Sequence, residues 1–480
     1  MKTSRLLSRI LFGLMVLCRL GYGQVAAPKP AEAPKPAEAP KPAEAPKPEM
    51  KPSDLVTHGP WLTYPGPGEL TIGFTTVPGC GGGVEYREVG TEEWKQAWHT
   101  EAGQIFRHRT ARSIRLTGLK KNGEYEYRLI LFVPRDKKYH EGSFPKLDNT
   151  HKTKQTVLVE NPDFRFKAFT DAAEPFTFSV TADLQFSRNV KHGILRSYYD
   201  KCGLKDSKFF AVIGDGHNDI GSMENSYIGT IIDGLQPIGG ASRPALFIRG
   251  NHEWRGGEAS LWTEYFPAPE TRSSYFTFQC GDTFFIVLDS GEDKPATRLT
   301  YHYTGDNIDD QAFREEQRVW LAKVVESPAF KSAKWRIAMC HSAIYSHPEA
   351  YMYNHLAHIC QDLFKKDKPE NRIHLWLSGH THVYSRTIPG TDQIYRPGNY
   401  RQVYGGKDYD FTVLTVEGPG GVGDINNCLV NVTVDKDKIS VEARTPENAL
   451  MDAFEIKNDG TVVDLNNDTL LMKKTPANYK

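Results

Sequence analysis

Five short polar motifs carry side chains that could bind metal ions. They contain Asp, Asn, Gln and His, whose carboxylate, amide and imidazole groups ligate metals without any thiolate. Singly, each has an ordinary explanation, such as a helix cap, a turn or a hydrogen-bonded core histidine. Together and in this order they are hard to obtain by chance, and they indicate a metal centre. The motifs are Asp183-x-Gln185, Gly214-Asp215, Gly250-Asn-His-Glu253, His341 and Gly379-His-Thr-His382.

Ligands of these types could hold two metal ions about 3.5–4 Å apart. Such a pair can hold a hydroxide and clamp the oxygens of a phosphoryl group during in-line displacement. A carboxylate has to bridge the two ions, and a short aspartate on a tight Gly-Asp turn can do so. The ligand types suit Zn, Mn or Fe and do not choose between them.

Six short apolar runs each end in a polar cluster, and most of these clusters carry candidate ligands. Continuous Val, Ile, Leu and Phe predict strands that are buried on both faces. Helical periodicity lies between the runs, for example from about Asp310 to Val325. Because ligands gather where such strands end in loops, the site is expected at the strand ends. The runs are Phe176–Asp183, Phe209–Asp215, Ala245–Asn251, Phe284–Asp289, Trp335–His341 and Ile373–His380.

The motifs resemble the calcineurin-like metallophosphoesterase signature, in which the Gly-Asn-His-Glu and Gly-His-x-His elements are the most specific. The second element extends to Gly379-His-Thr-His-Val-Tyr-Ser-Arg386, which is similar to the form found in purple acid phosphatases. The resemblance covers about residues 55–445. It implies an N-terminal fibronectin type III-like β-sandwich, followed by a mixed α/β metallophosphoesterase domain with two β-sheets packed face to face and flanked by helices.

The resemblance also implies a ligand set and an activity. Asp215 would bridge the two metal ions. Asp183, Gln185 and His382 would complete the first metal site, and Asn251, His341 and His380 would complete the second. The implied reaction is hydrolysis of phosphate esters by in-line attack of a metal-bound hydroxide.

Three further residues are candidates for contact with the substrate. His252 resembles a family histidine that binds no metal, and it would hydrogen-bond the phosphate and protonate the leaving alkoxide. Alternatively, His252 only positions Asn251. His217 and Arg255 could bind substrate, although a solvated turn would explain the first and a surface position or an ion pair the second.

Two positions depart from the purple acid phosphatase pattern. Gln185 stands where a His or another residue type appears in related enzymes, and its carbonyl oxygen is a weaker donor than imidazole. We therefore expect the first metal to be held loosely. Asn218 stands where the purple enzymes place a tyrosine ligand, so no iron–phenolate absorption band and an uncoloured protein are expected.

Residues 55–165 have the pattern of a β domain. Leu70, Ile72 and Phe74 alternate with other residues, the period that buries one face of a strand. Asn122-Gly123 lies between two such runs and predicts a hairpin turn, because both positions tolerate a positive φ. The metallophosphoesterase domain is expected at 170–464, with a tail at 465–480.

The first 54 residues differ in composition from the rest. Residues 1–24 combine a basic start, a short apolar core and small residues, which is the pattern of a secretory signal peptide. Within residues 25–54 the unit Ala-Pro-Lys-Pro-Ala-Glu repeats from Ala27 to about Pro48, which favours an extended, semi-rigid spacer. We expect a secreted, periplasmic or cell-surface protein without a transmembrane span in the mature chain.

The overall composition limits the function classes. Of 480 residues, 59 are Lys or Arg and 59 are Asp or Glu, while 39% are apolar. This balance excludes a basic nucleic-acid binder and a multi-span membrane protein. The seven cysteines are too widely spaced to indicate a disulfide framework or a metal knuckle.

The substrate stays open at this stage. A phosphorylated small molecule or another phosphate ester is expected, and a monoesterase, a phosphodiesterase and a nucleotidase would share the same metal centre. Two other classes are a catalytically weak cell-surface binding protein with an inert phosphatase fold, and a metallohydrolase that does not act on phosphate. The sequence does not indicate the oligomeric state.

Overall fold

The computed structural model describes residues 51–105, 109–134, 154–294, 308–345, 350–395, 405–416, 418 and 427–465. The expected signal peptide, most of the expected spacer and most of the expected tail lie outside these residues. Every described residue belongs to a single compact unit. Within the described part of the chain, no helix is long and apolar enough to cross a membrane.

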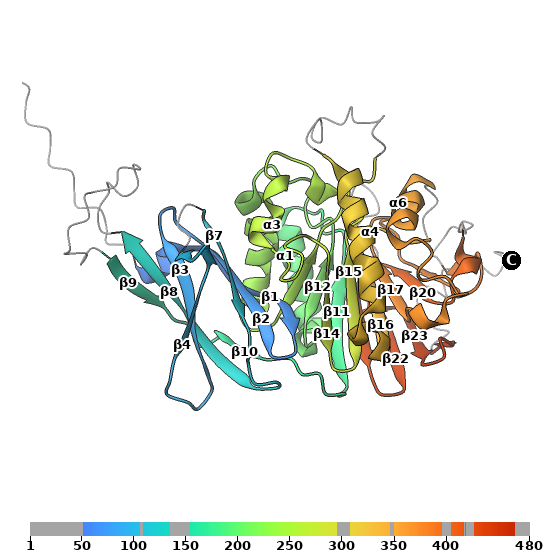
Figure 1. The fold of residues 1–480 in the computed structure, drawn as a ribbon, viewed down its shortest axis with the longest axis horizontal. Helices are drawn as coiled ribbons and strands as arrows, with labels where there is room; N and C mark the ends of the chain where they lie inside the picture. The colour runs from blue at the N-terminus through green and yellow to red at the C-terminus, as the bar shows by residue number, and fades with distance from the viewer. Residues whose placement is uncertain are drawn as a thin grey trace, which may run out of the picture. The chain divides into compact units, whose positions relative to one another are not determined.

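The N-terminal region consists of antiparallel strands in two main sheets (Figure 1). Ile72 and Phe74 of the first sheet share one core with Tyr127 and Leu129 of the second, which confirms a β-rich region. Its fibronectin type III identity stays a prediction. The first sheet has the order β1-β2-β7, with β1 (Val56–Gly66), β2 (Glu69–Thr76) and β7 (Ala111–Leu116). The second contains β3 (Gly81–Glu88), β4 (Lys95–Trp98), β8 (Glu124–Pro134), β9 (Lys154–Val159) and β10 (Arg165–Lys167), and β5 (Thr100–Glu101) pairs separately with β6 (Gln104–Ile105).

The predicted hairpin at Asn122-Gly123 is wrong. Asn122 does take a positive φ of 64°, and the Gly123 amide donates to the Lys120 carbonyl at 2.9 Å. The flanking strands nevertheless lie in different sheets, because β7 pairs with β2 and β8 pairs with β3. A two-residue hairpin needs strands that flank it directly, whereas residues 117–123 separate these two. The turn therefore carries the chain from one sheet to the other.

The β1-β2-β7 sheet is buried on both faces, more than the alternating pattern predicted. Leu62 of β1 lies in the core of the N-terminal region, whereas Trp61 and Tyr64 lie in the core of the domain that follows. Trp61 and Leu62 are adjacent and therefore point to opposite faces, so both faces are covered. Tyr64 departs from this alternation, with a φ of 46° at an irregularity of the strand. The Tyr64 hydroxyl also donates to the Phe266 carbonyl at 2.6 Å.

Two seven-stranded mixed sheets follow (Figure 1). In the first, of order β13-β12-β11-β21-β22-β23-β24, the strands β11, β12 and β13 are parallel. In the second, of order β14-β15-β16-β17-β20-β18-β19, the strands β15, β16, β17 and β20 are parallel. The first comprises β11 (Phe176–Thr181), β12 (Phe210–Ile213), β13 (Ala245–Ile248), β21 (Leu429–Val434), β22 (Lys438–Arg444), β23 (Leu450–Lys457) and β24 (Val462–Asp464). The second comprises β14 (Phe276–Cys280), β15 (Thr283–Leu288), β16 (Trp335–Cys340), β17 (Leu375–Ser378), β18 (Ser385–Thr387), β19 (Ile394–Tyr395) and β20 (Thr412–Thr415).

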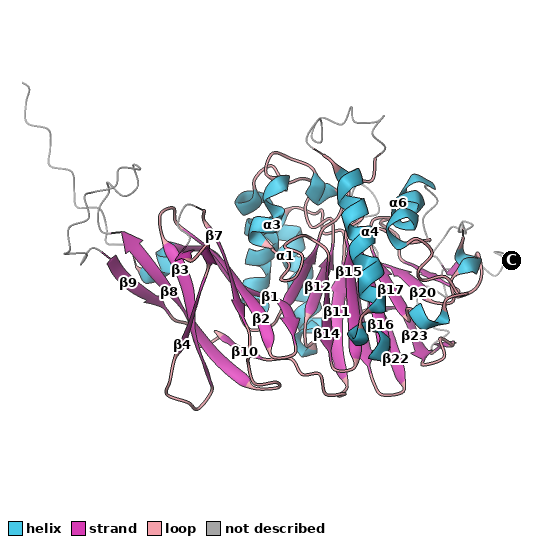
Figure 2. Cartoon of the chain, viewed as in Figure 1, coloured by secondary structure: helices cyan, strands magenta, loops and turns pink. Residues whose placement is uncertain are grey.

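The two sheets pack face to face around an aromatic core. Phe178 of the first sheet meets Phe285 of the second edge-on, with ring centroids 5.4 Å apart. Ile286, the neighbour of Phe285, points the other way and packs with Leu321 of α4 and Ile359 of α6. Helices thus cover the outer face of this sheet (Figure 2). The helices are α1 (Arg188–Lys201), α2 (Asp233–Leu235), α3 (Trp262–Tyr265), α4 (Asp310–Glu326), α5 (Pro328–Ser332) and α6 (Ala350–Cys360), with a π-helix at Met223–Ile232.

The strand and helix predictions for this domain are confirmed. All six apolar runs contain strands, β11, β12, β13, β15, β16 and β17, and the helix expected from about Asp310 to Val325 is α4. The mixed α/β arrangement of two facing sheets with flanking helices is therefore present. Since parallel strands end at the same edge of a sheet, the polar ends of these strands are brought together.

Candidate metal centre

Five candidate ligands lie just beyond the carboxyl ends of parallel strands. Asp183 and Asp215 follow β11 and β12 by two residues, and Asn251 follows β13 by three. His341 comes directly after β16, and His380 follows β17 by two residues. The two sheets meet here, because the His380 amide donates to both carboxylate oxygens of Asp183, at 2.9 and 3.1 Å.

Four of the candidate ligands have a left-handed backbone conformation. The φ angles are 55° at Asp183, 52° at Asp215, 75° at His380 and 54° at His382. Each such residue costs on the order of 1–3 kcal/mol relative to a relaxed backbone, and such strain concentrates at functional sites. All four side chains contribute atoms to the groups of prospective ligands at this edge.

The ligand atoms fall into two groups that share one carboxylate. Asp215, His341 and His380 form one group, and Asp183, Asp215 and His382 form the other, with all ligand atoms of a group within 4.8 Å of one another. Asp183 and Asp215 are almost fully buried, whereas the His382 side chain is 32% exposed. Asp215 therefore stands between two clusters, the position that a bridging carboxylate requires.

The arrangement around His341 fits a cation. Its Nδ1 lies 2.7 Å from the Ile213 carbonyl, an acceptor, so Nδ1 carries a proton. Its buried Nε2 has no hydrogen-bond partner among the described residues, although Asp215 Oδ2 is only 3.1 Å away. A metal ion against these atoms would satisfy the nitrogen lone pair and the carboxylate together. The donor set, imidazole and carboxylate without thiolate, also suits Zn, Mn or Fe.

The charges of Asp215 and His341 depend on each other. Burial alone would raise the pKa of the Asp215 carboxyl, but the His341 imidazole outweighs burial and holds that pKa below its ordinary value. Burial alone would lower the pKa of His341, but Asp215 raises it to about 10. The buried carboxylates at this edge thus favour positive charge next to them, from a proton or from a metal ion.

The two candidate amide ligands also reach this cluster. Gln185 Nε2 lies 3.2 Å from Asp215 Oδ2. Asn251 Oδ1 lies 2.9 Å from His380 Nδ1, so two prospective ligand atoms of the second site face each other. All seven residues that the sequence indicated as ligands are therefore brought together.

Gly250 is required by the close approach of the motifs. A Cβ atom there would lie 2.3 Å from Asp215 Oδ1 and 2.9 Å from Glu253 Oε2. Since real Cβ atoms are not found so close to other atoms, only glycine lets the chain pass behind the Asp215 carboxylate. The glycine in Gly-Asn-His-Glu is thus a packing requirement of the site.

Glu253, the last residue of that motif, has a role that the sequence analysis missed. Its carboxylate is fully buried and accepts hydrogen bonds from the amides of Asp215, Gly216 and Gly250 at 2.8–2.9 Å. Burial and the nearby Asp215 raise its pKa to about 7. Glu253 therefore holds the two ligand-bearing turns together. The sequence did contain a signal for this role, because Glu253 is an acidic residue directly after the candidate site residues Asn251 and His252.

His252 points towards the cluster from its edge. Its Nε2 lies 3.8 Å from Asp215 Oδ2, and its side chain is 26% exposed. Its Nδ1 lies 2.6 Å from the Asn218 carbonyl, and its Nε2 lies 3.1 Å from Arg255 Nη1. Because a carbonyl only accepts and a guanidinium only donates, the imidazole carries its proton on Nδ1 in this arrangement.

The other two substrate-binding candidates have partners within the protein. The Arg255 guanidinium pairs with Glu292 at 2.7 and 2.9 Å and with Asp293 at 2.5 Å, so the ion-pair explanation fits the structure. His217 lies outside both ligand groups, and its Nδ1 is 2.8 Å from the Asp219 carbonyl. Burial, together with the charge of Lys191, lowers the pKa of His217.

Tyr384 and Arg386, at the end of the extended motif that begins at Gly379, have a structural role. The Tyr384 hydroxyl donates to the Asp452 carboxylate at 3.0 Å, and Arg386 Nε donates to the same carboxylate at 2.7 Å. All three residues are buried. They tie the segment after His382 to β23, so the extended motif fixes the backbone beyond the ligands.

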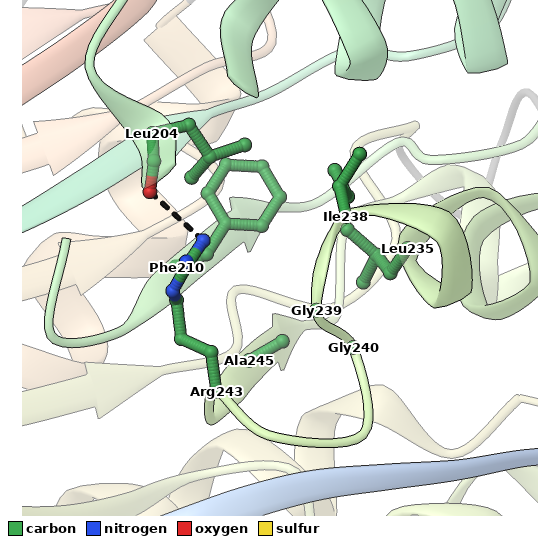
Figure 3. Close-up of a pocket in the computed structure, with 8 residues that line it drawn as sticks. All are labelled: Leu204, Phe210, Leu235, Ile238, Gly239, Gly240, Arg243 and Ala245. Carbon is green, nitrogen blue, oxygen red and sulfur yellow. Dashed lines mark hydrogen bonds between the residues drawn. The ribbon is translucent and has the colours of Figure 1, made fainter. Parts of the chain in front are cut away.

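The cavity in Figure 3 lies at the opposite edge of the first sheet. It is lined by Phe210 and Ala245, the first residues of β12 and β13, and Arg243 there donates to the Leu204 carbonyl at 2.8 Å. Its volume of about 10 Å³ accommodates at most one water molecule. It is therefore separate from the candidate metal centre and too small for an ester substrate.

Comparisons with known proteins agree with this geometry. Residues 176–384 match the family model described as calcineurin-like phosphoesterase. No curated protein matches the chain by sequence. A purple acid phosphatase from yellow lupin (Lupinus luteus) seeds has a similar structure, with a TM-score of 0.54, 16% identity, and coverage of 83% of this chain and 74% of that one.

A dimetal phosphatase from Danio rerio aligns over 59% of this chain and all of its own, with 14% identity and a TM-score of 0.42. At these identities the lupin enzyme shows only that the fold is shared. The family match spans β11 to Tyr384 and includes every candidate ligand. The chain therefore carries a calcineurin-like phosphoesterase domain at residues 176–384.

Proposed function

We propose that the protein is a dinuclear-metal phosphoesterase that hydrolyses phosphate esters. The observation that carries the proposal is Asp215, whose buried carboxylate belongs to both groups of ligand atoms. Two groups that share one carboxylate are what a two-metal site for phosphoryl transfer requires. The family match at residues 176–384 supports the same reaction class.

In this proposal the protein supplies two unequal half-sites. Asp183, His382 and Gln185 would hold one ion, and His341, His380 and Asn251 the other. When bound, the two ions would supply Lewis-acid stabilisation of the phosphoryl oxygens and activation of the attacking water. The first half-site uses the neutral Gln185 amide and the partly exposed His382, so it is expected to bind its ion less tightly.

His252 is proposed as the proton donor to the leaving group. The Asn218 carbonyl accepts the Nδ1 proton and thereby fixes the ring with Nε2 turned towards Asp215. In this structure Nε2 accepts from Arg255 Nη1, so to act as general acid the imidazole must take up a second proton on Nε2, give up that hydrogen bond and release the proton to the leaving alkoxide. Glu253 would keep the Asp215 and Gly250 turns in register during this step.

The remaining expectations form part of the same proposal. We place a fibronectin type III-like domain at 55–165 and the metallophosphoesterase domain at 170–464. We further propose that residues 1–24 direct export and that residues 25–54 are a spacer. The absence of a tyrosine at Asn218 supports an uncoloured enzyme, and a visible absorption band in the metal-loaded protein would contradict this.

The test is a substrate panel with a ligand-deficient control. The purified protein would be loaded with Zn, Mn or Fe and assayed on an aryl monoester, an aryl diester and nucleotides. We expect hydrolysis by the wild type and about a 10³-fold lower rate for Asp215→Asn. Preference for the diester or the nucleotides would identify a phosphodiesterase or a nucleotidase of the same fold. Equal rates for the wild type and Asp215→Asn would show that the proposed site is wrong.

A further inference from the structure

A cluster of charged residues borders the second half-site, and neither the proposed ligands nor the proposed proton donor include it. It consists of Arg255, Glu292, Asp293 and Lys294, and we call it the Arg255 cluster. Glu292 and Asp293 lie in the loop that follows β15, at the same sheet edge as the ligands. Both carboxylates are almost fully buried, with 2% or less of each side chain exposed. Their positions are therefore fixed by the fold.

Arg255 connects the two carboxylates to His252. One edge of its guanidinium, Nε and Nη2, pairs with both oxygens of Glu292, while Nη2 also reaches Asp293 Oδ1. Nη1 is thereby directed at His252 Nε2, at 3.1 Å. Lysine could not reproduce this contact, because only the planar guanidinium offers several donors at fixed angles.

Asp293 connects the same cluster to Asn251. Its Oδ1 accepts a hydrogen bond from Asn251 Nδ2 at 3.1 Å, and its Oδ2 pairs with the ammonium of Lys294. Because the amide nitrogen of Asn251 is held by a carboxylate, the amide oxygen must point the other way, towards His380 Nδ1. Asp293 thus decides which end of the Asn251 amide faces the second half-site.

We propose that Asp293 and Arg255 are positioning residues that brace the Asn251–His252 turn from its outer side, Asp293 by orienting the Asn251 oxygen for the second metal ion and Arg255 by fixing the His252 ring through Nε2 in its neutral state, before the imidazole takes up its second proton. Glu292 holds Arg255 in the required plane. The inference rests on the proposed function for His252, whereas the role of Asp293 in metal binding does not depend on which reaction follows.

The roles proposed for Asp293 and Arg255 lead to different predictions. Loss of the Asp293 carboxylate should weaken binding of one of the two metal ions, because hydrogen-bond partners of metal ligands typically change metal affinity or activity by about 10- to 100-fold. Loss of the Arg255 guanidinium should leave the metal content unchanged. It should lower kcat, with KM nearly unchanged, most strongly for esters of poorly acidic alcohols, which depend most on protonation of the leaving group.

The experiment uses the full-length protein and four variants. Metal titrations with Zn and Mn, followed by elemental analysis after gel filtration, compare the wild type with Asp293→Ala, Arg255→Gln and Arg255→Lys. Arg372→Gln is the matched control, because Arg372 also pairs with a carboxylate through Nε and Nη2 but lies just before β17, at the opposite edge of the sheet. We expect only Asp293→Ala to lose affinity at one site, by about 10- to 100-fold.

A double-mutant cycle tests whether Arg255 acts through His252. Arg255→Gln and Arg255→Lys should each lower kcat by about 10- to 100-fold in the wild type, but the same changes in a His252→Ala background should have little further effect, since Arg255 acts through His252. An equal additional loss in both backgrounds would overturn the role of Arg255. Unchanged metal affinity in Asp293→Ala would overturn the role of Asp293. If the wild type hydrolyses no ester, the proposed function fails, and the metal titration alone decides the inference.

Discussion

The two edges of the facing sheets differ in how their polar groups are paired. At the carboxyl edge, four candidate ligands have a positive φ, and within the part of the chain that the structure describes the buried Nε2 of His341 has no hydrogen-bond partner, although the Asp215 carboxylate lies beside it. At the amino edge, charged groups and an indole are paired within the protein, and the two buried side chains there that lack a hydrogen-bond partner among the described residues, Thr283 and Thr412, carry uncharged hydroxyls. The Trp335 indole, for example, donates to the Asp435 carbonyl at 2.9 Å, and Lys208 pairs with Glu174 at 3.0 Å.

The difference separates groups that serve a ligand from groups that serve the fold. Polar groups that the protein leaves unsatisfied in its interior are costly, and they persist where another species completes them. Changes at the carboxyl edge should therefore affect activity more than stability, whereas changes at the amino edge should affect stability alone. The following experiments can contradict this distinction between the two edges.

The largest effect is expected for Asp215→Asn. Its activity should fall about 10³-fold, equivalent to ~4 kcal/mol of transition-state stabilisation. The Tm of the metal-free protein should not fall, because an asparagine amide can donate a hydrogen bond to His341 Nε2 and removes a buried charge. Calorimetry of the metal-free proteins checks this. A lower Tm for the variant would mean that Asp215 serves the fold as well as the site.

The next effect is a pH-dependent loss of stability at the amino edge. Burial, helped by Arg336 and Arg372, lowers the pKa of His374 to about 4, from 6.5 in the unfolded chain. Between these values the unfolded state binds a proton that the folded state does not, so stability falls as the pH is lowered from 6.5 to 4. This group should contribute up to about 3 kcal/mol to that loss.

Denaturant unfolding of His374→Asn at pH 7.5 and 4.5 measures this contribution. The variant should lose about 2–3 kcal/mol less than the wild type between the two pH values. Its activity at pH 7.5 should be unchanged, because His374 lies just before β17, at the amino edge of the sheet, whereas the candidate ligands lie at the carboxyl edge. The same pH dependence in both proteins would show that His374 is protonated when folded.

The smallest effects are expected for two glycine substitutions. Gly250→Ala would place a Cβ 2.3 Å from Asp215 Oδ1, so the carboxylate must shift and activity should fall about 10-fold, or ~1.4 kcal/mol. Gly193→Ala in α1 is the control, because apart from its own helix backbone and chain neighbours no described atom lies within 4 Å of the added Cβ, and the helix should gain ~0.5–1 kcal/mol. Enzyme assays and urea unfolding check both variants. Full activity in Gly250→Ala would contradict the packing argument.

The strands and the ligand set were predictable because local patterns encode them. Apolar runs specified β11 and β16, and the polar residues after the runs specified Asp183 and His341, since parallel strands end together. The left-handed backbone of four ligands was not predictable, because it results from contacts between motifs distant in sequence. The sheet assignment of the strands around Asn122 failed for the same reason.

The residues that surround the ligands were harder to recognise than the ligands. Glu253 was visible as a motif residue without a role, because its three amide partners come from two different turns. Asp293 lies in a loop that no motif marks, after a strand of the second sheet, and only the packing of the two sheets brings it to Asn251, which follows a strand of the first. Sequence motifs identify groups by chemical type, whereas a bracing residue is defined by its distance to them.

The β1-β2-β7 sheet, which is buried on both faces, couples the stability of the N-terminal strands to that of the rest of the described unit. Trp61 and Tyr64 fill part of the core beside β14. From the second N-terminal sheet, the Tyr127 hydroxyl donates to the Ala241 carbonyl at 2.7 Å. A chain that began at residue 170 would expose this aromatic surface to water. The phosphoesterase domain and the strands before it should consequently melt together, in one cooperative transition, despite the boundary that their sequences suggest.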